Sequence, residues 1–487
     1  MGIIRPSSGR SAVLLRFRVA NHRSIRDECE LSLVAAEHEG TARSTGLRED
    51  GLDIGVEPVV GVFGANASGK SNLLSAMRYM RRAVRESFAE WTKLPDVPRE
   101  PFKLDPGALD ETSLFEVDLA LGAKRTTRYT YGFELSDERV EAEWLYAYPD
   151  GKRVVWFDRE ADRPLREGGE FVFDESDIGF RGRRDDLVAF TRPNALFLST
   201  AAALNDPQLS AVHRWFLDNL WLVTPGEDVA ARTEWTRRLL MDARAASRDP
   251  DAHLDKDARA ARAVSRNKDT HLGNDPRARS AASAKKGTGD YPERLAQLLA
   301  IADLGLTGVD IDRETGEVTL RHRTPDGGEA PLDFRTEESL GTHSWFAFLG
   351  PVLHVLDSGS TLLVDELDSS LHPTLAAEVV RLFQDPRANP RDAQLIFTTH
   401  DATLLGSEVL DTPLDRNQVW ITAKRRSGQT ELYRLTDAGP GPGENLERGY
   451  LRGRYGGVPR VGAGEIAREV SWQEEQWQRE REAKATA

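Results

Sequence analysis

The sequence holds one cysteine, Cys29, among its 487 residues. A single thiol allows no disulfide within the chain and no metal cluster built on cysteines. Such low cysteine use is typical of a reducing compartment, so we expect a cytoplasmic protein. Nothing in the sequence around Cys29 indicates a reactive thiol, and we interpret it as a small side chain beside a strand.

Long apolar runs are also missing. The longest candidate, residues 345–356, contains a glycine, a proline and a histidine, and it is shorter than the roughly 18 apolar residues that a membrane-spanning helix needs. We therefore expect a buried helix there and no association with a membrane. Residues 1–12 are mostly polar or small and lack the apolar segment of a secretory signal, which predicts a disordered extension.

The chain has no excess of basic residues, because 65 lysines and arginines stand against 79 acidic residues, for a net charge of −14. A protein that coats nucleic acid without sequence preference normally presents a basic face, so this balance argues against that class. A local basic groove is compatible with the same balance. The sequence therefore leaves open whether the protein binds nucleic acid.

The most informative stretch that the sequence does contain is residues 58–74. The apolar run at 59–63 predicts a buried strand, and the apolar spacing after Lys70 predicts a helix. Between them stands Gly64-Ala-Asn-Ala-Ser-Gly69-Lys70-Ser71, which has the spacing of a phosphate-binding loop between a strand and a helix. A glycine turn with a surface lysine is the alternative, but it would leave the flanking strand and helix unexplained.

Each part of this loop has an expected chemical role. Its glycines let successive backbone N–H groups point at phosphate oxygens, and the helix N-terminus adds partial positive charge. Lys70 is then the cation for the β and γ phosphates, and the Ser71 hydroxyl is a ligand for Mg²⁺. The predicted nucleotide-binding residues are Gly64, Ala65, Asn66, Ala67, Ser68, Gly69, Lys70, Ser71 and Asn72.

A second apolar strand, predicted at residues 360–364, ends in the two carboxylates Asp365 and Glu366. The carboxyl ends of strands are where an open α/β sheet places its ligand chemistry. Asp365 can support the Mg²⁺ shell, and Glu366 can orient and deprotonate the attacking water. Alone, the pattern could be a strand that enters a turn; beside a phosphate loop the two motifs require each other.

Three shorter motifs complete the candidate site. Asp368 follows the carboxylates, and His400 ends the next strand in Thr-Thr-His, where it could reach the γ-phosphate or be structural. Upstream, Ser339 and Gly341 stand just before a helix and could present a hydroxyl and backbone N–H groups to an anion. The alternative for this segment is an ordinary helix cap.

The wider pattern predicts an α/β fold. Strands and helices alternate after residue 306, which indicates a parallel sheet, whereas the alternating runs between residues 115 and 158 predict an antiparallel sheet. Residues 194–222 are expected to be helical. The charged segment 226–290 is either a solvated, mobile excursion or an arm that contacts a partner or a nucleic-acid backbone.

In their order, these motifs resemble an ABC-type ATPase head, and among such heads the SMC, RecF, RecN and OLD relatives. The loop at 64–72, the start at 15–25 and the segment 450–459 are similar to RloA-like ATPases of prokaryotic abortive-infection and phage-defence loci, which are often encoded beside an RloB-type protein. The resemblance implies an ABC/SMC-like P-loop NTPase head with an antiparallel β subdomain and an inserted helical region. It also implies ATP and Mg²⁺ as ligands.

The resemblance further implies roles for single residues. Lys70, Glu366 and His400 would be catalytic, with Glu366 as the base and His400 as the switch residue, while Ser71 and Asp365 would hold the metal. Asp368 would lie at a dimer seam, and Ser339 and Gly341 would act on the nucleotide of the opposite subunit. The sequence departs from the wider family in its Ser-Leu-Gly-Thr-His signature and in having Pro101-Phe-Lys-Leu where a metal-sensing glutamine is expected.

We accordingly expect a disordered extension at 1–12, an N-terminal part of the head at 13–190, a helical insertion at 191–305, a C-terminal part at 306–463 and a charged tail at 464–487. The expected function is that of a nucleotide-gated homodimer, or higher even oligomer, which regulates an effector encoded nearby, such as an RloB-like protein or a nuclease. A RecF-like or RecN-like DNA clamp is the competing class. A transporter motor would need a membrane partner, and no Toprim nuclease pattern follows His400.

Overall fold

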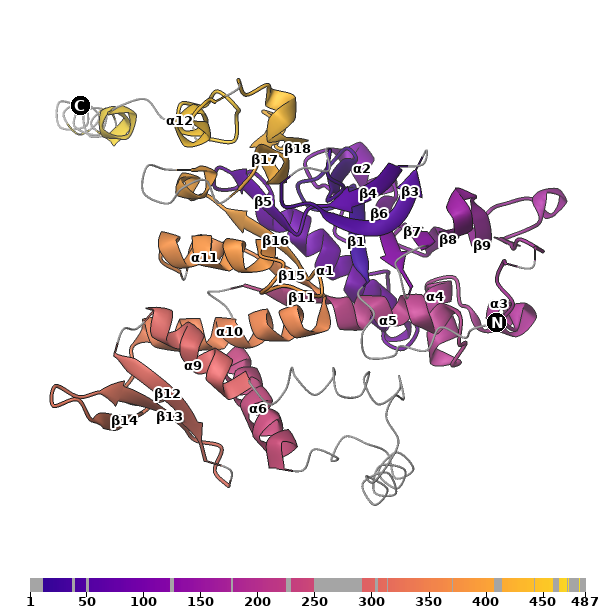
Figure 1. Cartoon of the computed structure of the whole chain (residues 1–487). Coiled ribbons are helices and arrows are strands. Elements are labelled where there is room, and N and C mark those ends of the chain that lie inside the picture. The colour runs from indigo at the N-terminus through magenta and orange to yellow at the C-terminus, as the bar shows by residue number, and fades with distance from the viewer. Residues whose placement is uncertain are drawn as a thin grey trace, which may run out of the picture.

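The computed structural model of the chain describes most residues from 12 to 470 (Figure 1). The described ranges are 12–36, 40–49, 52–122, 127–176, 178–224, 229–248, 291–302, 305–312, 314–369, 371–406, 414–441, 443–458 and 464–470, together with residues 472 and 481. Residues 1–11 of the extension predicted at 1–12 and most of the segment at 226–290 lie outside them. The part of that segment that is described is a helix, α6 (Val229–Arg248).

A six-stranded sheet forms the centre of the fold, in the order β11-β15-β16-β5-β17-β18. The first five strands are parallel and β18 pairs antiparallel with β17. The strands are β5 (Val59–Gly64), β11 (Leu220–Val223), β15 (Thr361–Val364), β16 (Gln394–Thr399), β17 (Val419–Lys424) and β18 (Thr430–Arg434). Every residue of β5, β15 and β16 is buried, as expected of parallel strands that helices cover on both faces.

The two faces of this sheet belong to different apolar cores. Along β5, Val60 and Val62 pack in one core with α1 (Lys70–Glu86), whereas Val59 and Phe63 pack in the other with α10 (Leu340–Ser358) and α11 (Pro373–Gln384). This alternation follows from the two-residue period of a strand. Figure 1 shows α10 and α11 together on one side of the sheet.

A seven-stranded antiparallel sheet shares the core of α1, in the order β10-β9-β8-β7-β6-β1-β2. Helices α3 (Arg184–Phe190), α4 (Phe197–Ala203) and α5 (Leu209–Asn219) contribute to the same core. The strands are β1 (Val13–Ala20), β2 (Cys29–Ser32), β6 (Ser113–Leu121), β7 (Thr127–Leu135), β8 (Val140–Tyr148), β9 (Val154–Glu160) and β10 (Phe171–Val172). The predicted α/β class with an antiparallel β subdomain is thus confirmed.

The buried side chain of Gln394 links the two large sheets. The Gln394 amide at the start of β16 accepts a hydrogen bond from the Leu14 N–H at 2.8 Å and donates one to the Leu14 carbonyl at 2.9 Å. Both backbone groups of Leu14 are therefore satisfied where β1 meets the parallel sheet.

A third unit packs on α10. It contains α6, α9 (Tyr291–Ala302) and the antiparallel sheet β12 (Leu306–Ile311), β13 (Val318–Arg323) and β14 (Glu329–Asp333). The Thr236 hydroxyl of α6 donates to the Phe346 carbonyl of α10 at 3.3 Å, and a side chain at Gly350 would collide with Thr236. The smaller elements are the hairpin of β3 (Arg43–Glu49) and β4 (Leu52–Val56), and the short helices α2 (Pro106–Asp110) and α12 (Leu446–Leu451).

Several elements differ from the sequence prediction. The hairpin β3–β4 and strand β14 were not expected, and residues 220–222 are part of strand β11 rather than of a helix. The predicted helical region 191–305 therefore also supplies an edge strand to the central sheet. Helix α10 begins at Leu340, directly after the Ser339 segment, and includes the whole run 345–356 predicted to be a buried helix. Among the helices that the structure describes, none has both the length and the apolar character needed to cross a bilayer.

His22 predicts how stability depends on pH. It is fully buried against Tyr79 and Phe115, and neither ring nitrogen has a hydrogen-bond partner among the described residues. Burial lowers the pKa of His22 to about 4, so the unfolded chain binds this proton more readily than the folded chain. We expect stability to fall as the pH drops from about 6.5 to 4, by about 1.4 kcal/mol for each pH unit.

Thermal or urea unfolding at several pH values measures this dependence. The variant His22→Phe keeps the ring contacts without a titratable nitrogen, so its unfolding curve should lose that part of the pH dependence. An unchanged pH dependence in His22→Phe would contradict the assignment.

Candidate nucleotide-binding site

The loop between β5 and α1 has the curled backbone that its glycines predict. Gly69 has φ +109°, Ala67 also lies in the left-handed region at φ +61°, and helix α1 starts at Lys70. A side chain at Gly69 would meet the Thr430 side chain, and one at Gly64 would meet Thr422. Close packing therefore requires glycine at both positions, and the left-handed backbone favours it at Gly69 as well.

The Lys70 ammonium lies within the loop. It donates hydrogen bonds to the carbonyls of Gly64 at 2.7 Å and Ala65 at 3.1 Å. Burial lowers the pKa of Lys70, and the nearby carboxylates of Glu366, Asp368 and Asp365 oppose that shift. The cation is thus held where a phosphate bound by the loop would lie.

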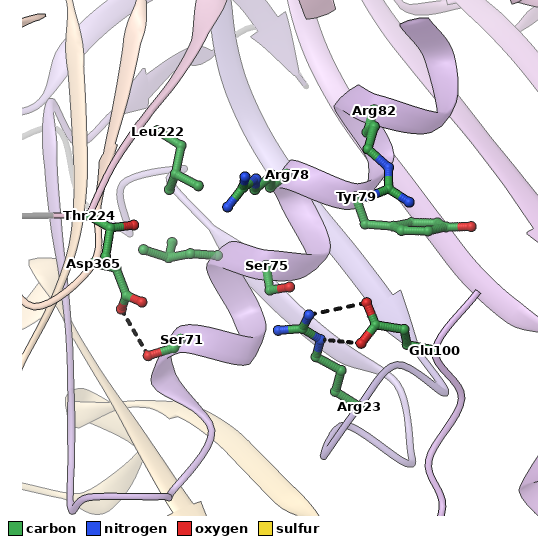
Figure 2. Close-up of a pocket in the computed structure, with 11 residues that line it drawn as sticks. Arg23, Ser71, Ser75, Arg78, Tyr79, Arg82, Glu100, Leu222, Thr224 and Asp365 are labelled. Atoms are coloured by element: carbon green, nitrogen blue, oxygen red, sulfur yellow. Dashed lines mark hydrogen bonds and ion pairs between the residues drawn. The ribbon is translucent and has the colours of Figure 1, made fainter. Parts of the chain in front are cut away.

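The two halves of the predicted site meet at Ser71 and Asp365. The Ser71 hydroxyl donates to the Asp365 carboxylate at 3.0 Å, although 294 positions separate the two residues (Figure 2). The Thr398 hydroxyl donates to the same carboxylate oxygen at 2.6 Å, and the Asp365 N–H donates to the Val223 carbonyl of β11 at 2.9 Å. The carboxylate is therefore fixed by hydroxyl groups from α1 and β16, and the backbone of Asp365 is fixed by β11.

Glu366 stands in a constrained position beside it. Its φ of +57° is uncommon for a residue other than glycine, and its N–H donates to the Thr398 hydroxyl at 2.7 Å. Such backbone conformations cost free energy and persist where the surrounding structure enforces them. Here the conformation leaves Glu366 exposed at the edge of the loop pocket.

His400 is oriented by Asp368. The histidine Nε2 lies 3.0 Å from one Asp368 carboxylate oxygen, and the Thr399 hydroxyl donates to the other oxygen at 2.7 Å. Asp368 is therefore nearly buried and acts on His400 within this chain. Its predicted contact across a dimer seam stays a prediction.

One pocket collects most of the predicted residues. Its described lining consists of Asn66, Ala67, Ser68, Gly69, Lys70, Ser71, Asn72, Glu366, His400 and Lys424. Gly64 and Ala65 contribute carbonyls to Lys70 instead. Lys424, at the end of β17, was not found from the sequence, nor was the bridging role of Thr398. Both stand at the carboxyl end of a parallel strand next to β5 or β15, which is the signal that could have identified them.

The signature segment lies elsewhere. Ser339 caps α10, accepting a hydrogen bond from the Thr342 N–H at 3.1 Å, so the alternative reading as a helix cap holds. Ser339 and Gly341 are exposed, and neither is among the described residues that line the loop pocket. The expected action of these two residues on the nucleotide of another subunit stays a prediction.

The segment that replaces the expected glutamine carries a charged pair. Glu100, just before Pro101, forms a two-pronged ion pair with Arg23. Figure 2 shows this pair in a pocket that also contains Ser71, Asp365 and the side chain of Arg78. The Glu100 carboxylate thus lines the same pocket as Ser71 and Asp365.

The donor set fits a magnesium nucleotide better than a metal bound by protein alone. Among the described residues, no group of three or more His, Cys, Asp or Glu side chains could hold a metal ion. Mg²⁺ usually takes one or two protein oxygens and completes its octahedral shell with phosphate oxygens and water. Ser71 and Asp365 supply such a pair beside the phosphate loop.

Comparison with known proteins gives the family. The family model described as "AAA domain, putative AbiEii toxin, Type IV TA system" (AAA_21) matches residues 59–406, well over half of the chain. A search of curated proteins found no match.

Three solved structures are similar to the chain at low identity. They are the SMC head domain from Thermotoga maritima (12% identity, 86% of this chain and 98% of that chain, TM-score 0.37) and two archaeal Smc heads. The head from Pyrococcus furiosus, with an extended coiled coil and bound to the C-terminal domain of ScpA, has 11% identity and a TM-score of 0.36. The match covers 88% of this chain and 98% of that chain. The head from Pyrococcus yayanosii, with a coiled coil and joint, has 11% sequence identity and a TM-score of 0.38. The match covers 88% of this chain and 99% of that chain.

Because these TM-scores lie below 0.5, the family assignment depends on the matched family model. The matched residues include the phosphate loop, the two carboxylates and His400. The chain therefore belongs to the AAA_21 family, and its α/β fold, with a phosphate loop between β5 and α1, is that of a P-loop ATPase.

Proposed function

We propose that the chain binds ATP with Mg²⁺ and hydrolyses it to ADP and phosphate. The observation that carries this proposal is the hydrogen bond between Ser71 and Asp365, which brings the loop hydroxyl and the strand carboxylate within 3.0 Å. Both are oxygen ligands of the kind Mg²⁺ prefers, and Lys70 lies in the same loop. When bound, Mg²⁺ would neutralise charge on the phosphate oxygens.

The remaining residues have distinct roles in this proposal. Lys70 exchanges its bonds to the loop carbonyls for bonds to the β and γ phosphates. Glu366 accepts a proton from the attacking water, for which its exposed carboxylate at the pocket edge is suited. His400, held by Asp368, donates a hydrogen bond toward the γ-phosphate.

We further propose that the complete site forms between two copies of the chain. Ser339 and Gly341 are exposed at the start of α10 and are not among the described lining of their own loop pocket. If each copy covers the nucleotide of the other with this segment, the assembly is a two-fold dimer with two ATP molecules. Higher even oligomers could be built from such dimers.

The biological role that we propose is control of a partner effector in defence against phage. Two observations support it: the description of the matched family names a putative AbiEii toxin and a Type IV TA system, and the motifs resemble RloA-like ATPases. The effector would be a protein encoded nearby, such as an RloB-like protein or a nuclease. Co-purification with neighbouring gene products tests this. ATP-dependent DNA capture that weakens steeply with salt would favour a DNA clamp instead.

The metal site gives a direct test of the ATPase. In Asp365→Asn the serine loses a charged partner, and a magnesium ion would lose a carboxylate ligand. We expect the Mg²⁺ concentration needed for half-maximal ATP hydrolysis to rise about 10- to 100-fold. Titration of activity with Mg²⁺ measures this.

The matched control is Asp401→Asn. Asp401 follows the neighbouring strand β16, but its carboxylate accepts a hydrogen bond from the Thr403 N–H and belongs to a turn. Its magnesium requirement should be unchanged. Hydrolysis by Asp365→Asn with the wild-type magnesium requirement would contradict the proposed metal site.

A further inference from the structure

A second hollow adjoins the loop pocket on the side of β17. Ala65, Asn66 and Ser68 form one wall, and the end of β17 with Lys424 forms another. The third wall is a glycine-rich segment that starts at the last residue of α12, which we call the C-terminal loop (residues 451–458). The two hollows share Asn66, Ser68 and Lys424, so one ligand can occupy both.

The C-terminal loop is held in place by two tyrosines. The Tyr450 hydroxyl donates to the Gly457 carbonyl at 3.0 Å, and the Tyr433 hydroxyl donates to the Tyr455 carbonyl at 2.7 Å. Gly456 and Gly457 have φ values of +74° and +69°, and side chains there would meet Tyr433 and Ile421. The loop thus presents an ordered backbone surface toward the hollow.

Cationic side chains line this hollow without anionic partners. Arg452, Arg426 and Lys424 are exposed and have no side-chain ion pair or hydrogen bond among the described residues. Their neighbours differ, because Arg454 pairs with Glu444 and Arg425 pairs with Glu431. In a chain with a net charge of −14, unpaired cations gathered at one hollow indicate an electron-rich ligand.

The strand order indicates which end of a nucleotide lies here. The groups for the γ-phosphate, Glu366 and His400, follow β15 and β16 on one side of β5, whereas β17 lies on the other side. A nucleotide whose terminal phosphate faces Glu366 and His400 therefore extends toward β17. The hollow beyond the loop on that side has apolar and backbone walls from Ala65, Leu451 and Val458.

We propose that this hollow receives the base and ribose of the nucleotide, with the Arg452 and Arg426 guanidinium groups against the faces and edges of the base. Planar guanidinium groups stack on aromatic rings, and a glycine-rich backbone surface lets a flat ring approach closely. This inference rests on the proposed function, since it assumes a nucleotide in the phosphate loop. It assigns nucleoside recognition to the C-terminal loop.

Comparing the affinities for ATP and for inorganic tripolyphosphate distinguishes the proposed nucleoside hollow from the phosphate loop. Tripolyphosphate has the phosphates without the nucleoside, so Arg452→Ala and Arg426→Ala together should weaken ATP about tenfold and tripolyphosphate less than about twofold. The matched control Arg454→Ala and Arg425→Ala removes two neighbouring arginines that are already paired, and it should leave the ratio of the two affinities unchanged. Calorimetry in the presence of Mg²⁺ measures all affinities.

Photolabelling with 8-azido-ATP locates the base directly. We expect the label in peptides that cover residues 422–458. A label confined to other peptides, or a ratio of ATP to tripolyphosphate affinity that the Arg452 and Arg426 substitutions leave unchanged, would overturn the inference. If wild-type protein binds neither ATP nor tripolyphosphate, the proposed function itself fails, and the two failures are thereby distinguished. Melting curves show that each variant is folded.

Discussion

Replacing Lys70 by alanine is expected to reduce ATP hydrolysis at least about 100-fold, because the cation that faces the β and γ phosphates is lost. Its ammonium is already positioned by the carbonyls of Gly64 and Ala65, and alanine has no charged group to put there. ATP binding should weaken as well. Phosphate release measures the first effect and calorimetry with ATP and Mg²⁺ the second.

Lys93→Ala is the control for this variant. Lys93 is exposed beyond the end of α1 and forms an ion pair with Glu90, so both hydrolysis and binding should stay at wild-type levels. If Lys70→Ala remained folded and hydrolysed ATP at the wild-type rate, the loop would not be the catalytic site. The lower pKa that burial gives Lys70 does not affect the comparison, because alanine has no charge at any pH.

Glu366→Gln is expected to slow hydrolysis about 10²- to 10⁴-fold while ATP binding is retained. Glutamine keeps the size and the backbone conformation of this residue but cannot accept the proton of water. Since hydrolysis would open the dimer, this variant should accumulate as a closed dimer when ATP is present. Light scattering with and without ATP measures the mass, and phosphate release measures the rate.

Glu378→Gln provides the matched control on α11, where Glu378 pairs with Arg381 on the surface. It should hydrolyse ATP normally and form no trapped dimer. Two results would contradict different parts of the proposal: a Glu366→Gln protein that stays monomeric with ATP argues against the dimer, and one that hydrolyses at the normal rate argues against Glu366 as the base.

Much of the site could be predicted because its motifs are local. The turn from β5 into α1 depends on glycines and on apolar periods that the sequence shows directly, and the same holds for β15 with Asp365 and Glu366. Their meeting at Ser71 followed from chemistry, since neither motif forms a nucleotide site without the other. The spatial roles of Thr398 and Lys424 required the strand order, which no local pattern contains.

The missed strands have physical reasons. Strand β11 is four residues long and follows α5 without a turn, so its apolar residues continue the helical pattern. Strand β14 contains Pro331, which a strand tolerates only at an edge. The hairpin β3–β4 is rich in polar residues and glycine, and its place is fixed by tertiary contacts such as that between Val56 and Val34.

Strand β11 connects Asp365, the proposed metal ligand, with more distant parts of the fold. The Val223 carbonyl accepts a hydrogen bond from the Asp365 N–H. The same strand precedes α6, whose Thr236 hydroxyl donates a hydrogen bond to a carbonyl of α10. Because Ser339 caps the start of α10, contacts through β11, α6 and α10 lead from Asp365 to the signature segment.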